Sequence, residues 1–297
     1  MGCLASVACE PDCGPRSRML KQAWQWQIVS PTDRLYTISL ARPLAAAPGS
    51  GYPVLYVLDP DTAFATLVDM VRNHESMYGP VIVVGVGYAA EADTSNRIFD
   101  LTPPTDPAAL PAFRPEGWGP VGGANSFLCF LRDTLKPQIA RRAPVDPARQ
   151  ALFGHSLGGL FVLHTLFEHP DAFDTYIAGS PSVWWGNKVL LNGLQEFKTR
   201  QRHSGLRRRL LITVGELEAT VSPEELRAAA LSSVDLREVR RHSQMVANAS
   251  SLAAQLETLS SVGLESVFTK FADETHTSVI PAYIGRGARF ALSGWFD

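Results

Sequence analysis

The chain of 297 residues is 45% hydrophobic and 19% charged, which excludes an intrinsically disordered protein and provides enough apolar side chains for a sizeable core. Its formal net charge of −2, from 27 basic and 29 acidic residues, gives no sign of a nucleic-acid partner or of a highly acidic substrate. No apolar stretch reaches the roughly 20 residues that a membrane-spanning helix needs.

Residues 1–30 are expected to form a flexible N-terminal segment. The segment lacks a basic leader and its apolar run is short for a signal peptide, so the cytoplasm and the periplasm both stay open as compartments. It holds three of the four cysteines, Cys3, Cys9 and Cys13. Cys129 lies in an apolar helical pattern and is expected in the core. No cysteine and histidine spacing of a metal site is present, so the sequence predicts no metal and no other cofactor.

Residues 31–297 are expected to form a single α/β domain with a mostly parallel central sheet and helices on both faces, because apolar runs alternate with helical patterns. In its first third, strands are expected at residues 35–43, 52–60 and 80–88. The last two are continuous apolar runs typical of buried parallel strands. A helix is expected at residues 62–74, starting after Asp61 or Thr62 as N-cap.

Residues 89–122 hold no clear element and many prolines, so a long loop is expected there. It leaves the carboxyl end of the strand at residues 80–88. Open α/β sheets place their ligand sites at that edge, which makes the loop a candidate determinant of specificity.

The rest of the chain keeps the alternation. Helices are expected at residues 127–139, 157–170, 243–263 and 279–292, the third ending at Gly263. Strands are expected at residues 149–156, 175–182, 208–216 and 264–272.

"GHSLG" at residues 154–158 matches the G-x-S-x-G pattern of a nucleophile elbow, with a predicted strand before it and a predicted helix after it. In this setting the α/β-hydrolase fold is expected, with Ser156 as nucleophile. A serine hydroxyl needs a base, and the base needs an acid that orients it. In this fold the chain order is serine, acid, histidine.

His276 is the expected base, because it follows the last predicted strand in the loop that leads into the final helix. His203 and His242 lie in arginine-rich polar surroundings and are expected at the surface. The acid should follow the strand at residues 208–216. Glu218 is the first choice, since it stands three residues after Gly215. Glu216, Asp273 and a Ser–His dyad without a strong acid remain open.

The tetrahedral intermediate of acyl transfer needs two N–H donors. The first is expected from the backbone of Leu157, directly after the nucleophile. The second is expected from Asp61, with Thr62 behind it, because Pro60 has no N–H.

The chain resembles the esterase-D-type α/β hydrolases, and among them the siderophore (enterobactin-type) esterases. The resemblance rests on "VLYVLD" at 54–59, "RIFDLTP" at 97–103, "GHSLGGLF" at 154–161, "SPSVWW" at 180–185, "VGELE" at 214–218 and "HTSVIP" at 276–281. These pieces stand in the family's order and span nearly the whole chain after the first 30 residues. The family's usual "LDG" reads "LDP" here, which leaves the details of the oxyanion loop open.

The resemblance implies a serine ester hydrolase that acts on a siderophore or its iron complex, with no metal cofactor of its own. It implies Ser156 as nucleophile and His276 as base, and adds substrate-binding candidates: Arg97, His155, Trp184 and Trp185. Two alternatives stay open for these side chains. Arg97 could pair with Asp100 to hold the long loop, and the two tryptophans could belong to the core.

Two other functions also stay open. The same machinery could cleave another ester, such as S-formylglutathione or a feruloyl or acetyl ester. A non-catalytic siderophore-binding protein could have kept the fold.

Overall fold

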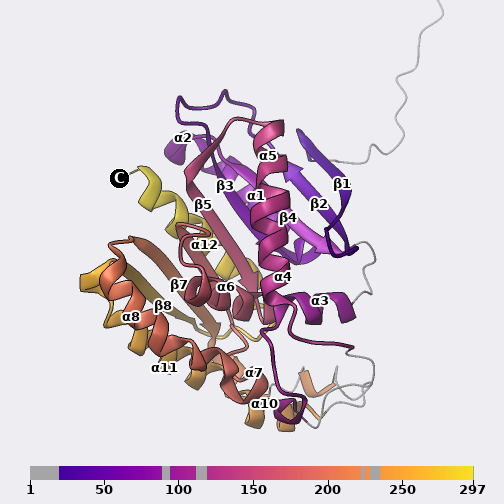
Figure 1. Ribbon diagram of the computed structural model, residues 1–297, viewed down its shortest axis with the longest axis vertical. Helices are drawn as coiled ribbons and strands as arrows, with labels where there is room; N and C mark the ends of the chain where they lie inside the picture. Colours follow the sequence, from indigo (N-terminus) through magenta and orange to yellow (C-terminus); the bar gives the residue numbers. More distant parts are fainter. Residues whose placement is uncertain (1–19, 89–93, 112–118, 222–224, 228–234, 297) are drawn as a thin grey trace, which may run out of the picture.

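The computed structural model describes residues 20–88, 94–111, 119–221, 225–227 and 235–296. Within them, eight strands form one sheet in the order β1-β2-β4-β3-β5-β6-β7-β8 (Figure 1). The strands are β1 (Ala23–Val29), β2 (Leu35–Ala41), β3 (Tyr52–Leu58), β4 (Ile82–Tyr88), β5 (Val145–His155), β6 (Thr175–Gly179), β7 (Arg208–Gly215) and β8 (Leu264–Phe271).

The sheet is parallel from β4 to β8, and only β1 and β2 at one edge run antiparallel to their neighbours. The apolar runs of β3 and β4 are buried almost throughout, as expected for strands covered on both faces. The predicted mostly parallel α/β sheet is therefore confirmed.

Helices cover both faces of the sheet. They are α1 (Pro60–Asn73), α2 (Glu75–Tyr78), α3 (Thr94–Leu101), α4 (Ala124–Cys129), α5 (Lys136–Arg142), α6 (Leu157–Glu168), α7 (Trp185–Lys188), α8 (Leu194–Ser204), α10 (Leu236–Ser243), α11 (Met245–Glu257) and α12 (Val279–Phe296). A π-helical turn, Phe130–Leu135, joins α4 to α5. Short 3-10 turns lie at Pro107–Ala109, Val189–Asn192, Glu216–Ala219 and Ser260–Val262.

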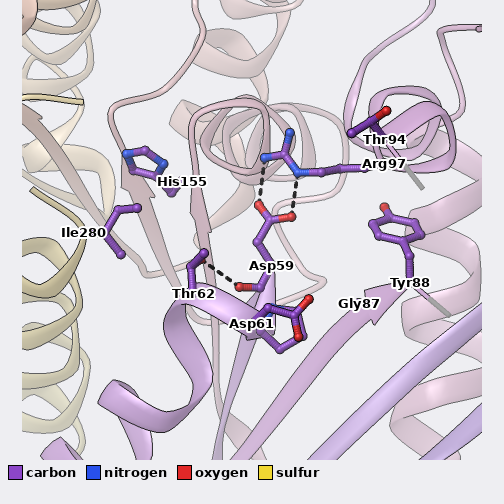
Figure 2. A pocket seen from close by; sticks show the side chains of 10 residues that line it. Asp59, Asp61, Thr62, Gly87, Tyr88, Thr94, Arg97, His155 and Ile280 are labelled. Atoms are coloured by element: carbon purple, nitrogen blue, oxygen red, sulfur yellow. Dashed lines mark hydrogen bonds and ion pairs between the residues drawn. The ribbon is translucent and has the colours of Figure 1, made fainter. Parts of the chain in front are cut away.

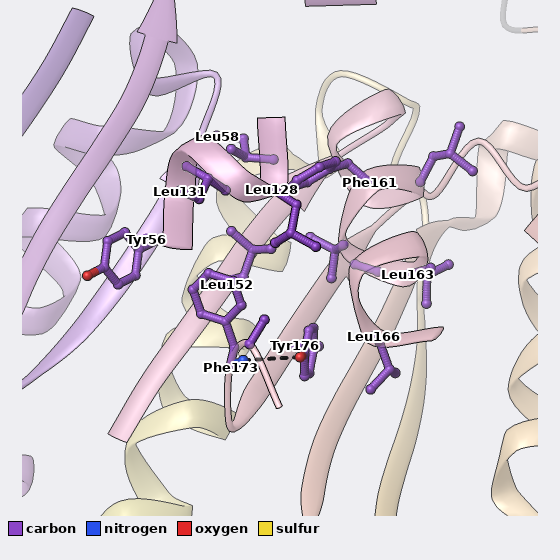
Figure 3. Packing of buried hydrophobic residues seen from close by; sticks show 14 of the residues in the cluster. Tyr56, Leu58, Leu128, Leu131, Leu152, Phe161, Leu163, Leu166, Phe173 and Tyr176 are labelled. Atoms are coloured by element: carbon purple, nitrogen blue, oxygen red, sulfur yellow. Dashed lines mark hydrogen bonds between the residues drawn. The ribbon is translucent and has the colours of Figure 1, made fainter. Parts of the chain in front are cut away.

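Two apolar clusters sandwich the sheet. On one face, α1 and α12 pack against side chains such as Leu55 and Phe153. On the other face, α4, α6, α8 and α11 form the larger cluster, in which Leu152 meets Leu128 and Phe161 (Figure 3). Burial of each such side chain contributes about 1.5–3 kcal/mol to folding. The central strand β5 is therefore fixed from both sides, and it ends at the nucleophile motif.

The N-terminal boundary differs from the expectation. Residues 23–29, expected in a flexible segment, form β1 and pair along their whole length with β2. Their sequence, "AWQWQIV", alternates in polarity, but most of its side chains are partly or fully exposed because β1 is an edge strand. The apolar signal was too weak to separate this strand from a tail. The cysteines Cys3, Cys9 and Cys13 lie outside the described residues.

Three local expectations were also wrong. The expected loop at residues 89–122 contains α3 and a 3-10 turn at Pro107–Ala109, although part of it lies outside the described residues. The helix expected to end at Gly263 ends at Glu257, and Gly263, at φ 98°, closes the following 3-10 turn. Cys129 is exposed, because the turns around it direct Phe127, Leu128 and Phe130 inward instead.

Candidate active site

Ser156 stands at a sharp turn between β5 and α6. Its backbone is held at φ 60° and ψ −116°, a conformation that side-chain-bearing residues rarely adopt. The turn is tight because a Cβ at Gly154 would meet the carbonyl oxygen of Gly158 at 2.2 Å. The N–H of Ser156 donates to Gly179 O at 2.9 Å. These contacts give Ser156 the geometry of a nucleophile elbow.

The hydroxyl of Ser156 is not yet engaged by a base. Among the described residues, its Oγ lies 3.5 Å from the Oγ of Ser182, and no hydrogen bond joins it to His276. Nucleophile–base contacts are often long without substrate and tighten in the reactive complex. The arrangement is therefore that of a resting site.

Glu218 and His276 form a close pair of titratable groups at this edge of the sheet. His276 Nδ1 lies 2.6 Å from Glu218 Oε2. The other oxygen of Glu218 accepts from Ser180 Oγ at 2.5 Å and from the N–H of Gly215 at 2.7 Å. Burial alone would raise the pKa of Glu218, but the hydrogen bonds from His276, Ser180 and Gly215 outweigh it and lower the pKa below its ordinary value.

The alternative acids lie elsewhere. Glu216 is exposed at the surface and pairs with Lys270, whose Nζ lies 2.9 Å from its Oε1. Asp273 is exposed in the loop between β8 and α12, at a backbone φ of 60°. The structure thus places Glu218, and neither of these two, against His276.

His155 directly precedes Ser156, and its ring lies tilted beside that of His276 and stacked on that of Tyr283. Its ring centroid lies 4.6 Å from that of His276 and 5.6 Å from that of Tyr283. Burial, followed by the nearby His276 and Arg97, lowers the pKa of His155 well below its usual value, so the ring is neutral at neutral pH. Its buried Nε2 has no hydrogen-bond partner among the described residues.

The expected oxyanion donors begin two helices. Leu157 opens α6 and Asp61 lies in the first turn of α1, where N–H groups have no intrahelical acceptor. Helix α1 starts two residues earlier than expected, at Pro60, with Asp59 as N-cap in the left-handed region at φ 51°. The N–H of Thr62 donates to Asp59 O at 3.2 Å, which leaves Asp61 as the freer donor.

Arg97, expected to bind substrate, forms an ion pair with Asp59, and not with Asp100 as in the alternative that the sequence left open. The Nε and NH2 groups of Arg97 lie 2.6 Å and 2.8 Å from the two carboxylate oxygens of Asp59 (Figure 2). Asp100 is buried and accepts instead from Tyr36 OH at 2.9 Å. Burial alone would lower the pKa of Arg97, but Asp59 outweighs burial and raises it. Arg97 therefore belongs to the pocket and is already paired there.

A pocket of about 570 Å³ includes His155, the residue before Ser156, in its lining (Figure 2). Its volume is in the range of small-molecule sites. Its lining combines the carboxyl end of β4, the start of α1, α3 and the residue before Ser156, namely Asp59, Pro60, Asp61, Thr62, Gly87, Tyr88, Thr94, Arg97, His155 and Ile280.

The two tryptophans of "SPSVWW" do not line this pocket. Trp185 is fully buried in the larger core cluster, where its Nε1 donates to Thr105 Oγ1 at 3.1 Å. Trp184 is partly exposed, and its ring meets that of His242 edge to face at 5.4 Å. The core alternative therefore holds for Trp185. His242 is exposed as expected, although it ends α10 and does not begin a helix.

Sequence reasoning missed three residues of the site. Asp59 stood within the recognised "VLYVLD", Tyr88 ended a predicted strand, and Ser180 opened "SPSVWW". Position at the carboxyl end of a strand was the available signal for each. Their partners, Arg97 for Asp59 and Glu218 for Ser180, lie 38 residues away in both cases, which no local pattern reveals.

Within the described part of the chain, no cluster of three or more His, Cys, Asp or Glu side chains could hold a metal ion. The same residues include no helix that is both long enough and apolar enough to span a bilayer.

Known proteins resemble this chain in sequence and in structure. The family model described as "Putative esterase" matches residues 30–255. "Ferri-bacillibactin esterase BesA" of Bacillus subtilis (strain 168) is 38% identical over 268 residues, which cover 88% of this chain and 86% of the relative. "Siderophore triacetylfusarinine C esterase" of Aspergillus fumigatus is 32% identical over 252 residues, 82% of each chain. The crystal structure of the BES protein from Bacillus cereus superimposes with a TM-score of 0.79 at 32% identity, and covers 93% of this chain and 98% of that one.

Proposed function

This chain belongs to the esterase family whose model matches residues 30–255, and from that premise we propose that it cleaves the ester bonds of a siderophore through an acyl-enzyme on Ser156. It is a serine ester hydrolase with the α/β-hydrolase fold. The relatives named as esterases of ferri-bacillibactin and of triacetylfusarinine C each match more than four-fifths of the chain, which supports the substrate class. Residues 31–297 act as one catalytic domain in this proposal, together with the preceding strand β1.

The observation that carries the proposal is the 2.6 Å contact between Glu218 and His276, next to the strained turn of Ser156. Glu218 accepts a hydrogen bond from the Nδ1–H group of His276, which leaves the lone pair of Nε2 free to act on the nucleophile. The lowered pKa of Glu218 keeps this carboxylate ionised at neutral pH.

The reaction proceeds in two halves. Ser156 Oγ attacks the ester carbonyl carbon as His276 takes its proton, and the oxyanion accepts hydrogen bonds from the N–H groups of Leu157 and Asp61. The tetrahedral intermediate then expels the alcohol, which leaves with the proton from His276. A water molecule, deprotonated by His276, attacks the acyl-enzyme; the bond to Ser156 Oγ then breaks, His276 returns the proton to Oγ, and the carboxylic acid is released.

Ser156→Ala tests the nucleophile. The variant is expected to lose labelling by a fluorophosphonate probe and all turnover of siderophore trilactones, followed by mass spectrometry, because no other group can form the acyl-enzyme. The same substrate panel includes S-formylglutathione, feruloyl esters and short p-nitrophenyl esters. Turnover of these esters together with inertness toward every siderophore would show that the substrate class is wrong.

Glu218→Gln tests the acid, with Glu216→Gln as the matched control on the same 3-10 turn. The amide oxygen would keep the donors Ser180 and Gly215, so the amide NH2 would face Nδ1 and hold His276 in the wrong tautomer, and kcat should fall about 10³–10⁴-fold. Glu216→Gln removes only an exposed ion pair with Lys270 and should leave kcat within a factor of about two. Equal effects of the two changes would contradict the assignment.

A further inference from the structure

The positive charge of Arg97 in the pocket is already compensated by the carboxylate of Asp59. Arg97 binds Asp59 through two parallel contacts of 2.6 Å and 2.8 Å, with 28% and 20% of the two side chains exposed. Such a bidentate pair holds its partners firmly and presents little net charge to a ligand. Arg97 is therefore poorly placed to attract a strongly anionic substrate.

A second carboxylate in the lining has no such partner. Asp61 is exposed in the first turn of α1, and no cation pairs with it among the described residues. The charged side chains of the lining are Asp59, Asp61 and Arg97, so it carries one net negative charge. This charge on the described lining opposes the binding of an anion there.

The remaining polar groups of the lining are neutral hydrogen-bonding groups. Tyr88 OH and His155 Nε2 are both buried without a partner among the described residues. Burial, with Asp100 and Asp59 nearby, raises the pKa of Tyr88 well above its usual value, so this phenol stays protonated. Buried groups of this kind need a partner. Amide, hydroxyl or hydroxamate groups of an uncharged ligand would satisfy them.

We infer that the pocket lined by Asp61, Tyr88 and Arg97 selects siderophore esters that carry no net negative charge. The inference rests on the siderophore esterase function proposed above. A catechol loses two protons when it binds iron(III) and a hydroxamate loses one, so a ferric tricatecholate is a trianion and a ferric trihydroxamate is neutral. An iron-free tricatecholate ester is also uncharged near neutral pH. Of the ferric tricatecholate, the ferric trihydroxamate and the iron-free tricatecholate, the pocket therefore disfavours only the first.

Arginines on α10 do not reverse this charge. Arg237 and Arg241 are exposed on α10, and neither belongs to the lining of the pocket. Arg240 is paired with Glu225.

The test compares kcat/KM for one cyclic tricatecholate trilactone with and without iron, and for a ferric trihydroxamate ester with and without iron. The wild-type enzyme is expected to cleave the iron-free tricatecholate at least about tenfold faster than its ferric complex. Iron should change the rate for the trihydroxamate far less. The difference for the tricatecholate should shrink as salt is added, because salt screens exposed charges. A faster rate on the ferric tricatecholate would overturn the inference.

Asp61→Asn isolates the charge, and Asp69→Asn makes the same change at another exposed position of α1 outside the lining. The ratio of iron-free to ferric rates should fall several-fold in Asp61→Asn and stay unchanged in Asp69→Asn. An unchanged ratio in both variants would also overturn the inference, since the penalty would then arise from size and not from charge.

Binding to Ser156→Ala, measured by calorimetry, separates the inference from the function on which it rests. Tighter binding of the uncharged esters supports the charge selection even if the wild-type enzyme turns over no siderophore, a result that would refute only the proposed function. Tighter binding of the ferric tricatecholate refutes the charge selection, whatever the turnover.

Discussion

Ser180 shows how much a single residue can contribute to the site without reaching the substrate. It is fully buried and its backbone is held at φ 41°, where side-chain-bearing residues are rare. In that conformation its Oγ donates to Glu218 Oε1 at 2.5 Å, while Glu218 Oε2 faces His276. Ser180 is therefore a positioning residue for the acid.

Ser180→Ala should move the pH profile as well as the rate. Loss of the hydroxyl removes one of the contacts that lower the pKa of Glu218, so Glu218 takes up its proton at a higher pH. Protonated Glu218 has no negative charge to stabilise the imidazolium of His276, so the acidic limb of kcat/KM should shift upward while kcat falls about tenfold.

The control for this change is Ser182→Ala, because Ser182 faces Ser156 Oγ and makes no contact with Glu218 in the described structure. Its acidic limb should stay in place. A uniform loss of rate in Ser180→Ala, with the limb unmoved, would show that Ser180 serves only the packing of this corner.

At the scale of elements, the pair Arg97–Asp59 ties α3 to the start of α1. Asp59 is the N-cap of α1 in a left-handed conformation, and the candidate donor Asp61 follows two residues later. The guanidinium thus fixes the turn that would receive the oxyanion.

Arg97→Lys should weaken catalysis more than folding. An ammonium group cannot bind both oxygens of Asp59 at once, so the turn loses a fixed geometry while the charge remains. We expect kcat to fall about tenfold, with the midpoint of thermal unfolding within about 2 °C of wild type. A rise in KM at constant kcat would instead indicate that Arg97 contacts the substrate in the ground state.

The sequence was most informative where a local pattern decides the structure. The continuous apolar runs of β3 and β4 identified the parallel sheet, and the order of Ser156, Glu218 and His276 identified the candidate triad. Local patterns failed where contacts between residues far apart in the sequence determine the structure. Strand β1 was not predicted because its side chains are exposed at the edge of the sheet, and α3 was not predicted because its surroundings are rich in proline. Cys129 was placed in the core because the sequence does not show which side of its helix faces the sheet.

The whole molecule is held by two apolar clusters on either side of one sheet, and few ionisable groups lie inside them. His164 is one of these groups. It is 7% exposed on α6, and its Nε2 lies 2.8 Å from Asn125 Oδ1 on α4. Burial lowers the pKa of His164 from 6.5 to about 4, so the folded protein holds it neutral.

This histidine should make the fold sensitive to mild acid. Between pH 6.5 and 4 the unfolded chain binds a proton at His164 that the folded chain does not, so the free energy of unfolding falls as the pH falls. The contribution is about 3 kcal/mol at most, at 1.36 kcal/mol per pKa unit.

Urea unfolding at pH 7 and pH 4.5 measures how much the free energy of unfolding falls over this interval. His164→Gln should lose less stability over this interval than wild type, and His203→Gln, at an exposed position on α8, should lose as much as wild type. Equal losses in all three proteins would show that His164 is already charged in the folded state.

The order of the candidate triad along the chain has a consequence for protein synthesis. Ser156 ends a central strand, whereas Glu218 and His276 follow β7 and β8, which join the sheet next to β6 at its far edge. During synthesis, the candidate nucleophile Ser156 therefore leaves the ribosome long before His276, its proposed base. In the proposed mechanism, a chain that ends before His276 has no base for Ser156. Hydrolytic activity is expected only after β8 has joined the sheet.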